Sequence, residues 1–290
     1  MKEIVILSGK GGTGKSSVCS ALAHIKKDNI LVADCDVDAA DLHLIMAPEK
    51  VPGVDFFSGV IAEIDADKCT ACGLCAQKCR FDAISLHEGK YRVEPLDCEG
   101  CAYCYYICPE EAIAIPEQNI GNYYQAESRL GFTLVHARLN IGAENSGKLV
   151  AKVKSIAKEQ CKKEGKDFML VDGSPGIGCP VISSLAGVDY VILVTEATYS
   201  GLSDLERLWE LLDMFKLPGA CLINKADINP EIAADIRKFM QKKKIADLGD
   251  IEYSDDFPRA IAMGRTLIEE NETRWRPVFE RIWQTIEEKI

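Results

Sequence analysis

The chain has 290 residues, and its 34 Lys and Arg against 45 Asp and Glu give a formal net charge of −11. With 47% hydrophobic and 27% charged residues, the composition excludes a disordered or collagen-like chain. The acidic balance argues against a dedicated nucleic-acid binder, which normally carries a basic stripe. No apolar run approaches the ~20 residues that a membrane span requires, so we expect no nucleic-acid partner, no membrane contact and a cytoplasmic location.

The thirteen cysteines point to metal binding. Eight of them lie within the 40 residues from Cys69 to Cys108. The N-terminal residues Met1–Leu7 have the pattern of a first strand and not that of a secretion signal. In a reducing cytoplasm, such a density of thiols indicates metal ligation and not a disulfide framework.

Residues 1–60 have the pattern of an α/β unit. Apolar Ile4–Ser8 is followed by a glycine-rich loop at Gly9–Gly14, a helical pattern over Ser16–Lys27 and a short apolar run at Ile30–Ala33. Strands that are apolar throughout are typical of a parallel sheet, because both of its faces are covered.

The same alternation resumes at about residue 118. We expect buried strands at Phe168–Val171, Tyr190–Thr195 and Ala220–Ile223, separated by helices such as Ser203–Phe215 and Glu231–Lys244. The predicted fold class is α/β, with a doubly wound, mostly parallel sheet interrupted by a small α+β insert. The predicted domains are 1–60 and 118–290 for the two parts of the host and 61–117 for the insert.

The insert contains an internal repeat of four cysteines with the spacing C-x2-C-x2-C-x3-C, and the second copy follows the first at an offset of 29 residues. At this spacing the first three thiolates hold one 4Fe–4S cluster, and the fourth points away and ligates the other cluster. The predicted ligands are Cys69, Cys72, Cys75 and Cys108 for the first cluster, and Cys79, Cys98, Cys101 and Cys104 for the second. A pair of zinc knuckles is the alternative, because C-x2-C pairs also hold zinc.

The insert resembles the bacterial two-cluster ferredoxins over its whole length, and Pro109 after the last cysteine fits their pattern. The first copy departs from that pattern with Arg80, where proline is usual, which affects the expected tuning of its cluster and not its existence. Between residues 62 and 116, ten acidic and five basic side chains give a formal net charge of −5 before any cluster is counted. A redox partner that docks here should therefore present a basic face.

The glycine-rich stretch has the context of a phosphate-binding loop, because it follows a predicted strand and opens a predicted helix. Its glycines let successive backbone N–H groups turn toward phosphates, and the helix N-terminus adds a positive dipole. Lys15 would reach the β- and γ-phosphates, and the Ser16 hydroxyl would ligate Mg²⁺. The residues predicted to bind the nucleotide here are Gly9, Lys10, Gly11, Gly12, Thr13, Gly14, Lys15, Ser16 and Ser17.

Three further motifs lie at the ends of predicted strands: Asp34-Cys35-Asp36, Val171-Asp172-Gly173-Ser174-Pro175-Gly176 and Asn224-Lys225-Ala226-Asp227. Together with the second lysine of the loop, Lys10, they resemble the deviant Walker A ATPases, which include the MinD/ParA group, the Mrp-type iron–sulfur carriers and the nitrogenase iron protein. This resemblance spans essentially the whole chain outside the insert.

The resemblance implies a catalytic set of Lys10, Lys15 and Asp36. Lys10 would cross a dimer interface to the partner's nucleotide, and Asp36 would orient or activate the attacking water. Such a set suffices because phosphoryl transfer needs mainly positioning and charge neutralisation. The resemblance also implies that Asp34, through water, and Asp172 hold Mg²⁺ together with Ser16, and that the Gly176 backbone senses the γ-phosphate.

The N-K-x-D string does not decide which base the nucleotide carries. In GTPases this string binds guanine, whereas Asn224 at the same strand end contacts adenine in MinD-like ATPases. Asn224 and Asp227 are therefore predicted nucleotide contacts. The Lys10 signature and the MinD-like stretch Tyr253–Phe257 favour ATP over GTP.

Cys179 is a candidate metal or cluster contact, because it lies seven residues after Asp172, where the nitrogenase iron protein carries a cluster-ligating cysteine. The other ligand loop of that protein corresponds to about residues 140–148, which contain no cysteine, so a four-thiolate bridging cluster is not available from this chain alone. The alternative is a small residue in a turn. The remaining cysteines, Cys19, Cys35, Cys161 and Cys221, are expected to be structural.

The C-terminal residues 275–290 repeat apolar side chains at helical spacing. MinD binds membrane through a terminal amphipathic helix, but the polar face here carries mixed charge and not a basic stripe. We therefore expect this helix to dock on the protein itself or on a partner.

These features predict an ATP-binding and hydrolysing iron–sulfur protein with two 4Fe–4S clusters and Mg²⁺, acting as a homodimer or as a heterodimer with a paralogue. Nucleotide-driven dimer switching would be coupled to electron transfer or to metallocluster assembly on a client protein, and the sequence does not choose between these two. The alternatives are a MinD/ParA-like spatial or partitioning switch with redox-sensing clusters, and a GTP-dependent metallochaperone.

Overall fold

The structure is a computed structural model that describes residues 1–143 and 146–290. The chain divides into two compact units. The larger unit comprises residues 1–54, 123–139 and 146–290, and the smaller unit contains residues 55–122 and the described residues 140–143. The polypeptide leaves the larger unit within strand β3 (Val54–Val60) and returns to it within strand β8 (Glu117–Glu127).

In the described parts of the chain, nine strands form one sheet in the order β13-β12-β11-β1-β10-β2-β9-β8-β3. Every neighbouring pair from β13 to β9 is parallel. The prediction of a doubly wound, mostly parallel sheet is therefore confirmed. The other strands of this sheet are β1 (Lys2–Leu7), β2 (Ile30–Asp34), β9 (Thr133–Leu139), β10 (Phe168–Asp172), β11 (Tyr190–Glu196), β12 (Gly219–Asn224) and β13 (Ala246–Ile251).

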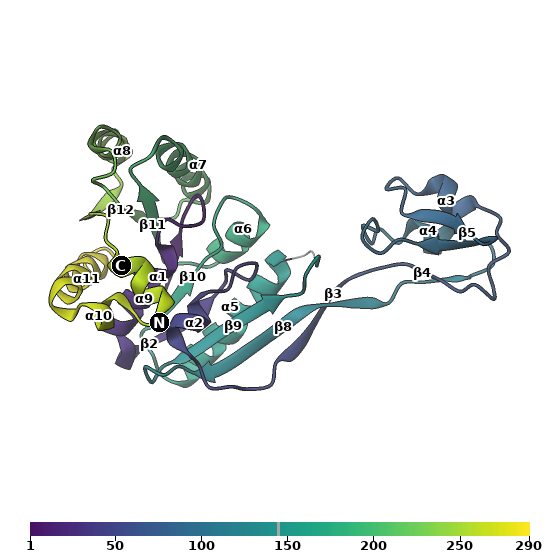
Figure 1. The fold of residues 1–290 in the computed structure, drawn as a ribbon, viewed down its shortest axis with the longest axis horizontal. Helices are drawn as coiled ribbons and strands as arrows, with labels where there is room; N and C mark the ends of the chain where they lie inside the picture. Colours follow the sequence, from purple (N-terminus) through teal and green to yellow (C-terminus); the bar gives the residue numbers. More distant parts are fainter. Residues whose placement is uncertain (144–145) are drawn as a thin grey trace. The chain divides into compact units, whose positions relative to one another are not determined.

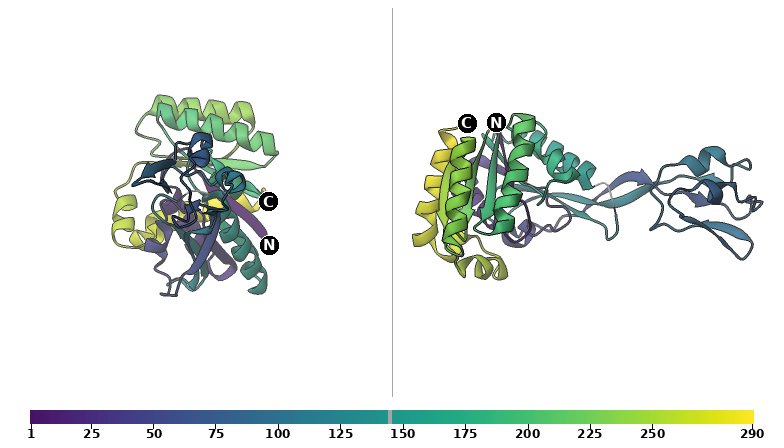
Figure 2. Two further views of the ribbon diagram at one scale, coloured as in Figure 1. Left: turned by 90° about the vertical axis from the view of Figure 1, so that its right-hand side faces the viewer. Right: turned by 90° about the horizontal axis from the view of Figure 1, so that it is seen from above.

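Helices cover both faces of this sheet (Figures 1 and 2). Side chains alternate between the two faces of each strand, so that Ile4 and Ile6 of β1 join the core that contains α1 and α11, whereas Leu7 lies against Gly173. The helices of the larger unit are α1 (Lys15–Ile25), α2 (Leu42–Met46), α5 (Ser146–Lys163), α6 (Cys179–Leu185), α7 (Tyr199–Phe215), α8 (Pro230–Lys243), α9 (Asp256–Ala262), α10 (Leu267–Glu270) and α11 (Glu272–Glu287), with a short 3₁₀ turn, η1, at Lys27–Asn29.

The C-terminal helix α11 docks on the larger unit, as predicted. Its apolar stripe is buried in the same core as α1. The ring of Trp283 packs edge-on against Phe168 at 5.1 Å, and the indole N–H of Trp275 donates to Asp256 at 2.9 Å. Among the described helices, none combines the length and the apolar character that crossing a bilayer demands.

A buried ion pair ties β1 to α5 and to the end of α6. The Lys154 ammonium lies 2.6 Å from Glu3 Oε1, and it donates to the carbonyl oxygens of Ser184 and Ala186. Both charged side chains are buried. Lys158, which is half-buried, contacts the other oxygen of the same carboxylate at 3.2 Å.

Replacing Lys154 with methionine is expected to lower the free energy of unfolding by about 3–5 kcal/mol, because it leaves the buried Glu3 carboxylate with too little compensation. Lys158→Met is the matched control, with an expected cost of about 1 kcal/mol or less, since Lys158 is the more exposed of the two lysines and Glu3 keeps Lys154 as its buried partner. Urea unfolding followed by tryptophan fluorescence measures this, because all three tryptophans lie in the larger unit. Equal losses in the two variants would contradict the expectation.

His136 of β9 lies in an aromatic stack. Its ring lies 4.8 Å from that of Tyr124 and 5.6 Å from that of His43, nearly parallel to both. Burial, with a smaller contribution from His43, lowers the pKa of His136 to about 4. As the pH falls, the His136 ring is therefore protonated at a higher pH in the unfolded chain than in the folded protein.

The contribution of neutral His136 to stability is fully present above the unfolded pKa of about 6.5 and is lost as the pH falls from there toward 4. We expect the free energy of unfolding to drop by about 1–2 kcal/mol between pH 7 and pH 5 through this group. A His136→Phe variant should lose that part of the pH dependence in urea unfolding. An unchanged slope between pH 7 and pH 5 would show that another group is responsible.

The backbone of the smaller unit repeats with the same 29-residue offset as its cysteines. Helix α3 (Leu74–Lys78) is matched by α4 (Tyr103–Ile107). Positive φ angles recur in pairs at the same offset, at Ala71 and Gly100, Gly73 and Ala102, and Asp82 and Glu111. Two short antiparallel pairs complete the unit, β4 (Glu63–Ile64) with β7 (Ile113–Ala114) and β5 (Ile84–His87) with β6 (Lys90–Val93).

Candidate functional site

The glycine-rich loop joins β1 to α1 and is shaped by close packing on one side and by free space on the other. A Cβ atom on Gly14 would come within 2.5 Å of the Asn224 amide nitrogen, at a φ of +94° that favours glycine. On Gly11 and Gly12, by contrast, a Cβ would meet no atom within 4 Å. The loop therefore leaves room beside its backbone for a group such as a phosphate.

Lys15 is buried at the start of α1 and pairs with carboxylates from two strand ends. Its ammonium lies 2.8 Å from Asp172 Oδ1 and 3.3 Å from Asp36 Oδ2. Burial alone would lower the pKa of Lys15, but Asp172 and Asp36 outweigh it and raise the pKa above its ordinary value. The side chain is thus a fixed positive charge beneath the loop.

The three predicted carboxylates gather beside this single lysine. Asp34 and Asp172 are register partners on the adjacent strands β2 and β10, and Asp36 follows β2. Burial, with repulsion from Asp172, raises the pKa of both Asp34 and Asp36. Asp34 Oδ2 and Asp36 Oδ1 are buried without a hydrogen-bond partner. These two oxygen atoms are therefore available to interact with a cation.

These donors fit Mg²⁺, which is usually bound through one or two carboxylates and keeps several waters. Within the described residues, no three His, Cys, Asp or Glu side chains close around one point where a metal ion would sit. Ser16, Asp34 and Asp172 are the residues that would hold it.

Lys10 is held within its own chain. Its ammonium lies 2.6 Å from Glu196 Oε1 and donates to the Ser200 hydroxyl at 2.8 Å. The other Glu196 oxygen accepts from Lys225 at 2.8 Å, and Lys225 also donates to the Gly12 carbonyl at 2.9 Å. Although burial disfavours the carboxylate, hydrogen bonds from Lys10 and Lys225 hold the pKa of Glu196 below its ordinary value.

Glu196 is a site residue that the sequence analysis missed. It ends β11, which lies next to β1, and in open α/β sheets ligands bind beyond the carboxyl ends of the strands. A charged residue at the end of an otherwise apolar predicted strand was the available signal.

Two neighbouring cavities lie along the loop. A cavity of about 190 Å³ is lined by the loop from Gly11 to Ser17, by Asp36 and by Pro175. A second, of about 300 Å³, shares Gly12, Gly14, Ser17 and Ile261 with the first. Its other lining residues are Asn224, Lys225, Tyr253, Ser254, Phe257 and Pro258. The pair provides a polar compartment for phosphates next to a more apolar one.

Some predicted nucleotide contacts have other partners. The Asn224 amide donates to the Thr13 carbonyl at 2.7 Å, and Asp227 accepts from the Tyr253 backbone N–H at 2.6 Å. The Gly176 N–H donates to the Ser8 carbonyl at 2.9 Å. Among the predicted site residues, Gly9, Lys10, Asp34, Asp172, Gly176 and Asp227 line neither cavity.

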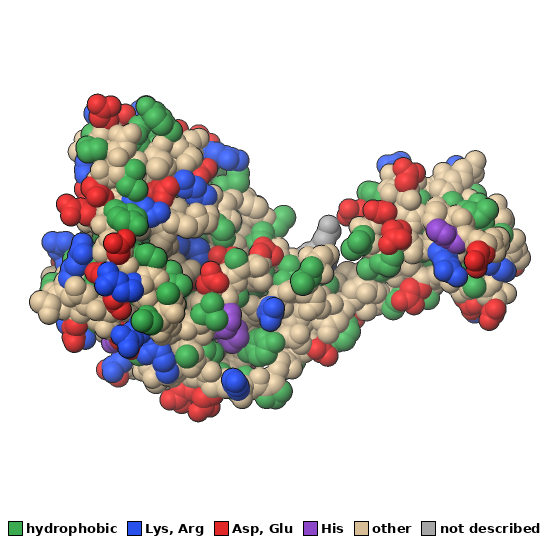
Figure 3. Space-filling model, viewed as in Figure 1, with side chains coloured by type: hydrophobic (Ala, Val, Ile, Leu, Met, Phe, Trp, Pro, Cys, Tyr) green, Lys and Arg blue, Asp and Glu red, His purple; other side chains and the backbone are tan. Residues whose placement is uncertain are grey.

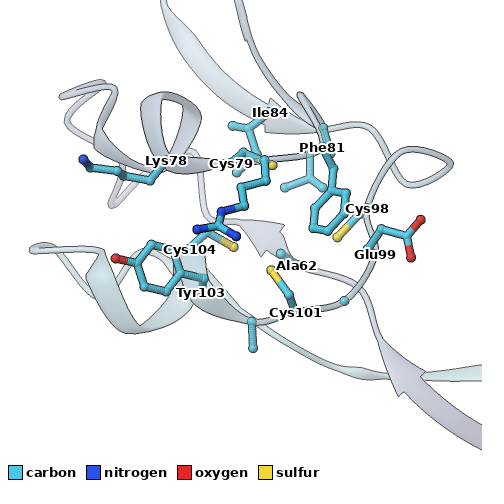
Figure 4. A pocket seen from close by; sticks show the side chains of 15 residues that line it. Ala62, Lys78, Cys79, Phe81, Ile84, Cys98, Glu99, Cys101, Tyr103 and Cys104 are labelled. Carbon is cyan, nitrogen blue, oxygen red and sulfur yellow. The ribbon is translucent and has the colours of Figure 1, made fainter.

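In the smaller unit, the eight clustered cysteines divide between two cavities. The larger, of about 540 Å³, is lined by Cys98, Cys101 and Cys104 of the second copy and by Cys79 of the first (Figure 4). The smaller, of about 20 Å³, is lined by Cys69, Cys72, Cys75 and Cys108. The fourth cysteine of each copy thus lines the cavity formed by the first three cysteines of the other copy.

The first cysteine set has polar and thiol neighbours. Burial raises the pKa of Cys75, and the thiols of Cys69 and Cys108 add to the rise. Backbone N–H groups of Ala71 and Ala112 point at the sulfurs of Cys69 and Cys108 at 3.4 Å. Two sets of four thiols, each around its own cavity, match the four ligands that each 4Fe–4S cluster takes.

The other cysteines lie in the larger unit. Cys179 is the exposed first residue of α6, whereas Cys19, Cys35, Cys161 and Cys221 are buried. Residues 140–148 form the loop that corresponds to the other ligand loop of the nitrogenase iron protein. Two of them, Glu144 and Asn145, lie outside the described residues. The role of Cys179 stays a prediction.

Comparison with known proteins agrees with the division of the chain into a cysteine-rich unit and a larger α/β unit. Residues 62–115 match the 4Fe–4S dicluster domain family. The uncharacterised protein MJ0578 of Methanocaldococcus jannaschii is 37% identical over 229 residues, which are 78% of this chain and 79% of that protein. MJ0579 of the same organism is 26% identical over 79% of this chain and 82% of its own length.

A solved structure of the septum site-determining protein MinD from Pyrococcus horikoshii, complexed with Mg-ADP, is similar with a TM-score of 0.58. It is 18% identical and covers 97% of this chain and 93% of its own. The fold is thus that of the MinD/ParA P-loop ATPases, with a 4Fe–4S dicluster ferredoxin domain inserted in it. The chain belongs to the same family as MJ0578.

Proposed function

We propose that this protein binds and hydrolyses ATP and uses the nucleotide state to control electron transfer from two 4Fe–4S clusters to a client protein. The observation that carries the proposal concerns strand β2. Its end bears the carboxylates beside Lys15, and the sheet continues from it through β9 to β8, the strand by which the chain returns from the smaller unit. A change at Asp34 or Asp36 therefore has a hydrogen-bonded route toward the cysteine-rich segment.

At the loop, binding of a triphosphate would draw Lys15 from Asp172 and Asp36 onto the β- and γ-phosphates. Asp36 would then be free to orient the attacking water, and the Gly176 N–H would exchange the Ser8 carbonyl for a γ-phosphate oxygen. When bound, Mg²⁺ neutralises phosphate charge, which is the main requirement of phosphoryl transfer. The unpartnered oxygens of Asp34 and Asp36 support this assignment.

Adenine fits the second cavity better than guanine. Guanine presents N–H donors on its Watson–Crick edge and calls for a carboxylate acceptor. Among the described residues that line this cavity there is no carboxylate, and Asp227 already accepts the Tyr253 N–H. ATP is therefore the proposed nucleotide.

Lys10 would act across a dimer. Its ion pair with Glu196 and its bond to Ser200 hold it near its own loop, and both would be exchanged for the nucleotide of the partner subunit. The dimer is proposed as a homodimer or as a heterodimer with a paralogue. The second arrangement is supported by the presence of two related chains, MJ0578 and MJ0579, in one organism.

The placement of the cysteines favours electron transfer over cluster assembly. The two cavities account for all eight clustered thiols, and Cys179 is a single exposed thiol in the described part of the larger unit. One such thiolate per chain, or two in a homodimer, falls short of the four ligands that an iron–sulfur cluster usually takes. In the proposed step, a reduced cluster passes one electron to an oxidised centre of the client and returns to its oxidised state.

Anaerobic purification with quantification of iron and sulfide, followed by hydrolysis assays with ATP and competing GTP, tests this function. We expect about eight irons per chain, as two cubanes require, and ATP hydrolysis that excess GTP does not suppress. One or two zinc ions in place of iron, or preferential GTP hydrolysis, would overturn it.

A further inference from the structure

The two halves of the smaller unit have similar backbone conformations but differ in the charge of their side chains. Residues 94–111 of the second half contain five acidic side chains and no basic one. Their counterparts 29 residues earlier, residues 65–82, contain three acidic and three basic side chains. The five acids of the second half are Glu94, Asp97, Glu99, Glu110 and Glu111; all are exposed, and the described residues offer them no ion-pair partner.

The second half also carries exposed aromatic rings. Helix α4 carries Tyr103, Tyr105 and Tyr106, which are 52%, 44% and 76% exposed. The equivalent positions of α3 are Leu74, Ala76 and Gln77. Tyrosine supplies a large contact area with a polar tip and is enriched in protein interfaces. We refer to α4 and the five carboxylates as the tyrosine face.

The tyrosine face adjoins the larger of the two cysteine cavities. Tyr103 and Glu99 line the 540 Å³ cavity of Cys79, Cys98, Cys101 and Cys104. Glu110 lines the other cysteine cavity, of about 20 Å³. Two residues of the face thus border the second site and one borders the first, which favours the second cluster as the one that an acceptor meets.

Two cations, Lys78 and Arg80, also line the 540 Å³ cavity, and both come from the first half. The labelled ammonium of Lys78 points away from the cysteine sulfurs in Figure 4. The five carboxylates of the second half outnumber these two charges. Figure 3 shows acidic and hydrophobic side chains, with some Lys and Arg between them, on the visible face of this unit.

We propose that the tyrosine face is the docking surface of the redox client and that electrons leave the protein through the second cluster. The client it fits presents an apolar centre ringed by Lys and Arg, because such a ring complements five unpaired carboxylates and steers the encounter. This inference rests on the proposed electron-transfer function and adds to it the exit cluster and the chemistry of the partner.

Mitochondrial cytochrome c, a basic haem protein, serves as the probe. The protein with its clusters reduced by dithionite is mixed anaerobically with ferric cytochrome c, so that each reduced cluster gives one electron and each ferric haem becomes ferrous. The double variant Tyr105→Ser/Tyr106→Ser is expected to lower the second-order rate about tenfold or more. Glu110→Gln/Glu111→Gln should lower the rate and weaken its dependence on salt.

Leu86→Ser is the matched control, because Leu86 is 57% exposed on β5, outside the tyrosine face. It should leave the rate unchanged. Ferricyanide, a small acceptor that needs no docking surface, should oxidise all four proteins at the same rate, and their iron content and EPR spectra should agree. These measurements separate docking from cluster loss.

The docking proposal is overturned if both double variants reduce cytochrome c as fast as the parent, or if Leu86→Ser slows the reaction as much as they do. In either case, a parent that still passes electrons leaves the proposed function standing. If the clusters of the parent accept no electron or release none to ferricyanide, the proposed function fails and the docking surface fails with it.

Discussion

A Lys15→Ala variant is expected to lose ATP hydrolysis by a factor of about 10²–10³ or more, the effect typical of removing one charge that stabilises a transition state. The structure adds a second consequence. Lys15 is the cation in contact with Asp36 and Asp172, so its removal leaves buried carboxylates without their counter-charge. The free energy of unfolding without nucleotide should fall by about 3–5 kcal/mol, as for other broken buried pairs. Turnover assays and urea unfolding measure the two effects.

Lys10→Ala is the matched control for this prediction. Lys10 is partly exposed and pairs with Glu196, which keeps Lys225 as a partner when Lys10 is removed. The stability loss should therefore stay near 1 kcal/mol or below. Nucleotide binding by a single chain should survive in Lys10→Ala and fail in Lys15→Ala. Equal stability losses in the two variants would contradict the placement of Lys15 as the central charge.

Each fourth cysteine is expected to control the cluster of the opposite copy. Cys79→Ala should remove the cluster held by Cys98, Cys101 and Cys104, and with it about four of eight irons, because Cys79 lines their cavity. Cys108→Ala should likewise remove the cluster of the first copy. Iron and sulfide quantification with EPR of the reduced protein measures the loss.

Double variants make the assignment decisive. Cys79→Ala/Cys101→Ala changes two ligands of one cluster and should lose no more iron than Cys79→Ala alone. Cys79→Ala/Cys72→Ala changes one ligand of each cluster and should lose nearly all of it. The reverse outcome would mean that each copy ligates its own cluster.

The sequence predicted those parts of the fold and site that depend on local pattern. Apolar runs located β1, β2, β10, β11 and β12 to within one or two residues, because strands covered on both faces are apolar throughout. The cysteine spacing predicted how the eight thiols are grouped, and the grouping around the two cavities agrees with it.

What the sequence did not predict depends on contacts between distant segments. Glu196 meets Lys10 only because β11 lies beside β1 in the sheet. Its charge at the end of an apolar strand marks a site residue but does not identify Lys10 as its partner. The contact of Asp227 with the backbone N–H of Tyr253, which is 26 residues away, was likewise not predicted, and the contact of Asp227 with the nucleotide stays a prediction. Such partners follow from strand order and loop packing, which local periodicity does not encode.

The central claim is that the clusters respond to the nucleotide. The most direct test is an anaerobic redox titration of the clusters, followed by EPR, without nucleotide and with a non-hydrolysable Mg-ATP analogue, on the parent and on Lys15→Ala. The account predicts that the analogue shifts the reduction potential or the EPR signal of at least one cluster in the parent and leaves the variant unchanged. Identical titrations of the nucleotide-saturated and nucleotide-free parent would contradict it.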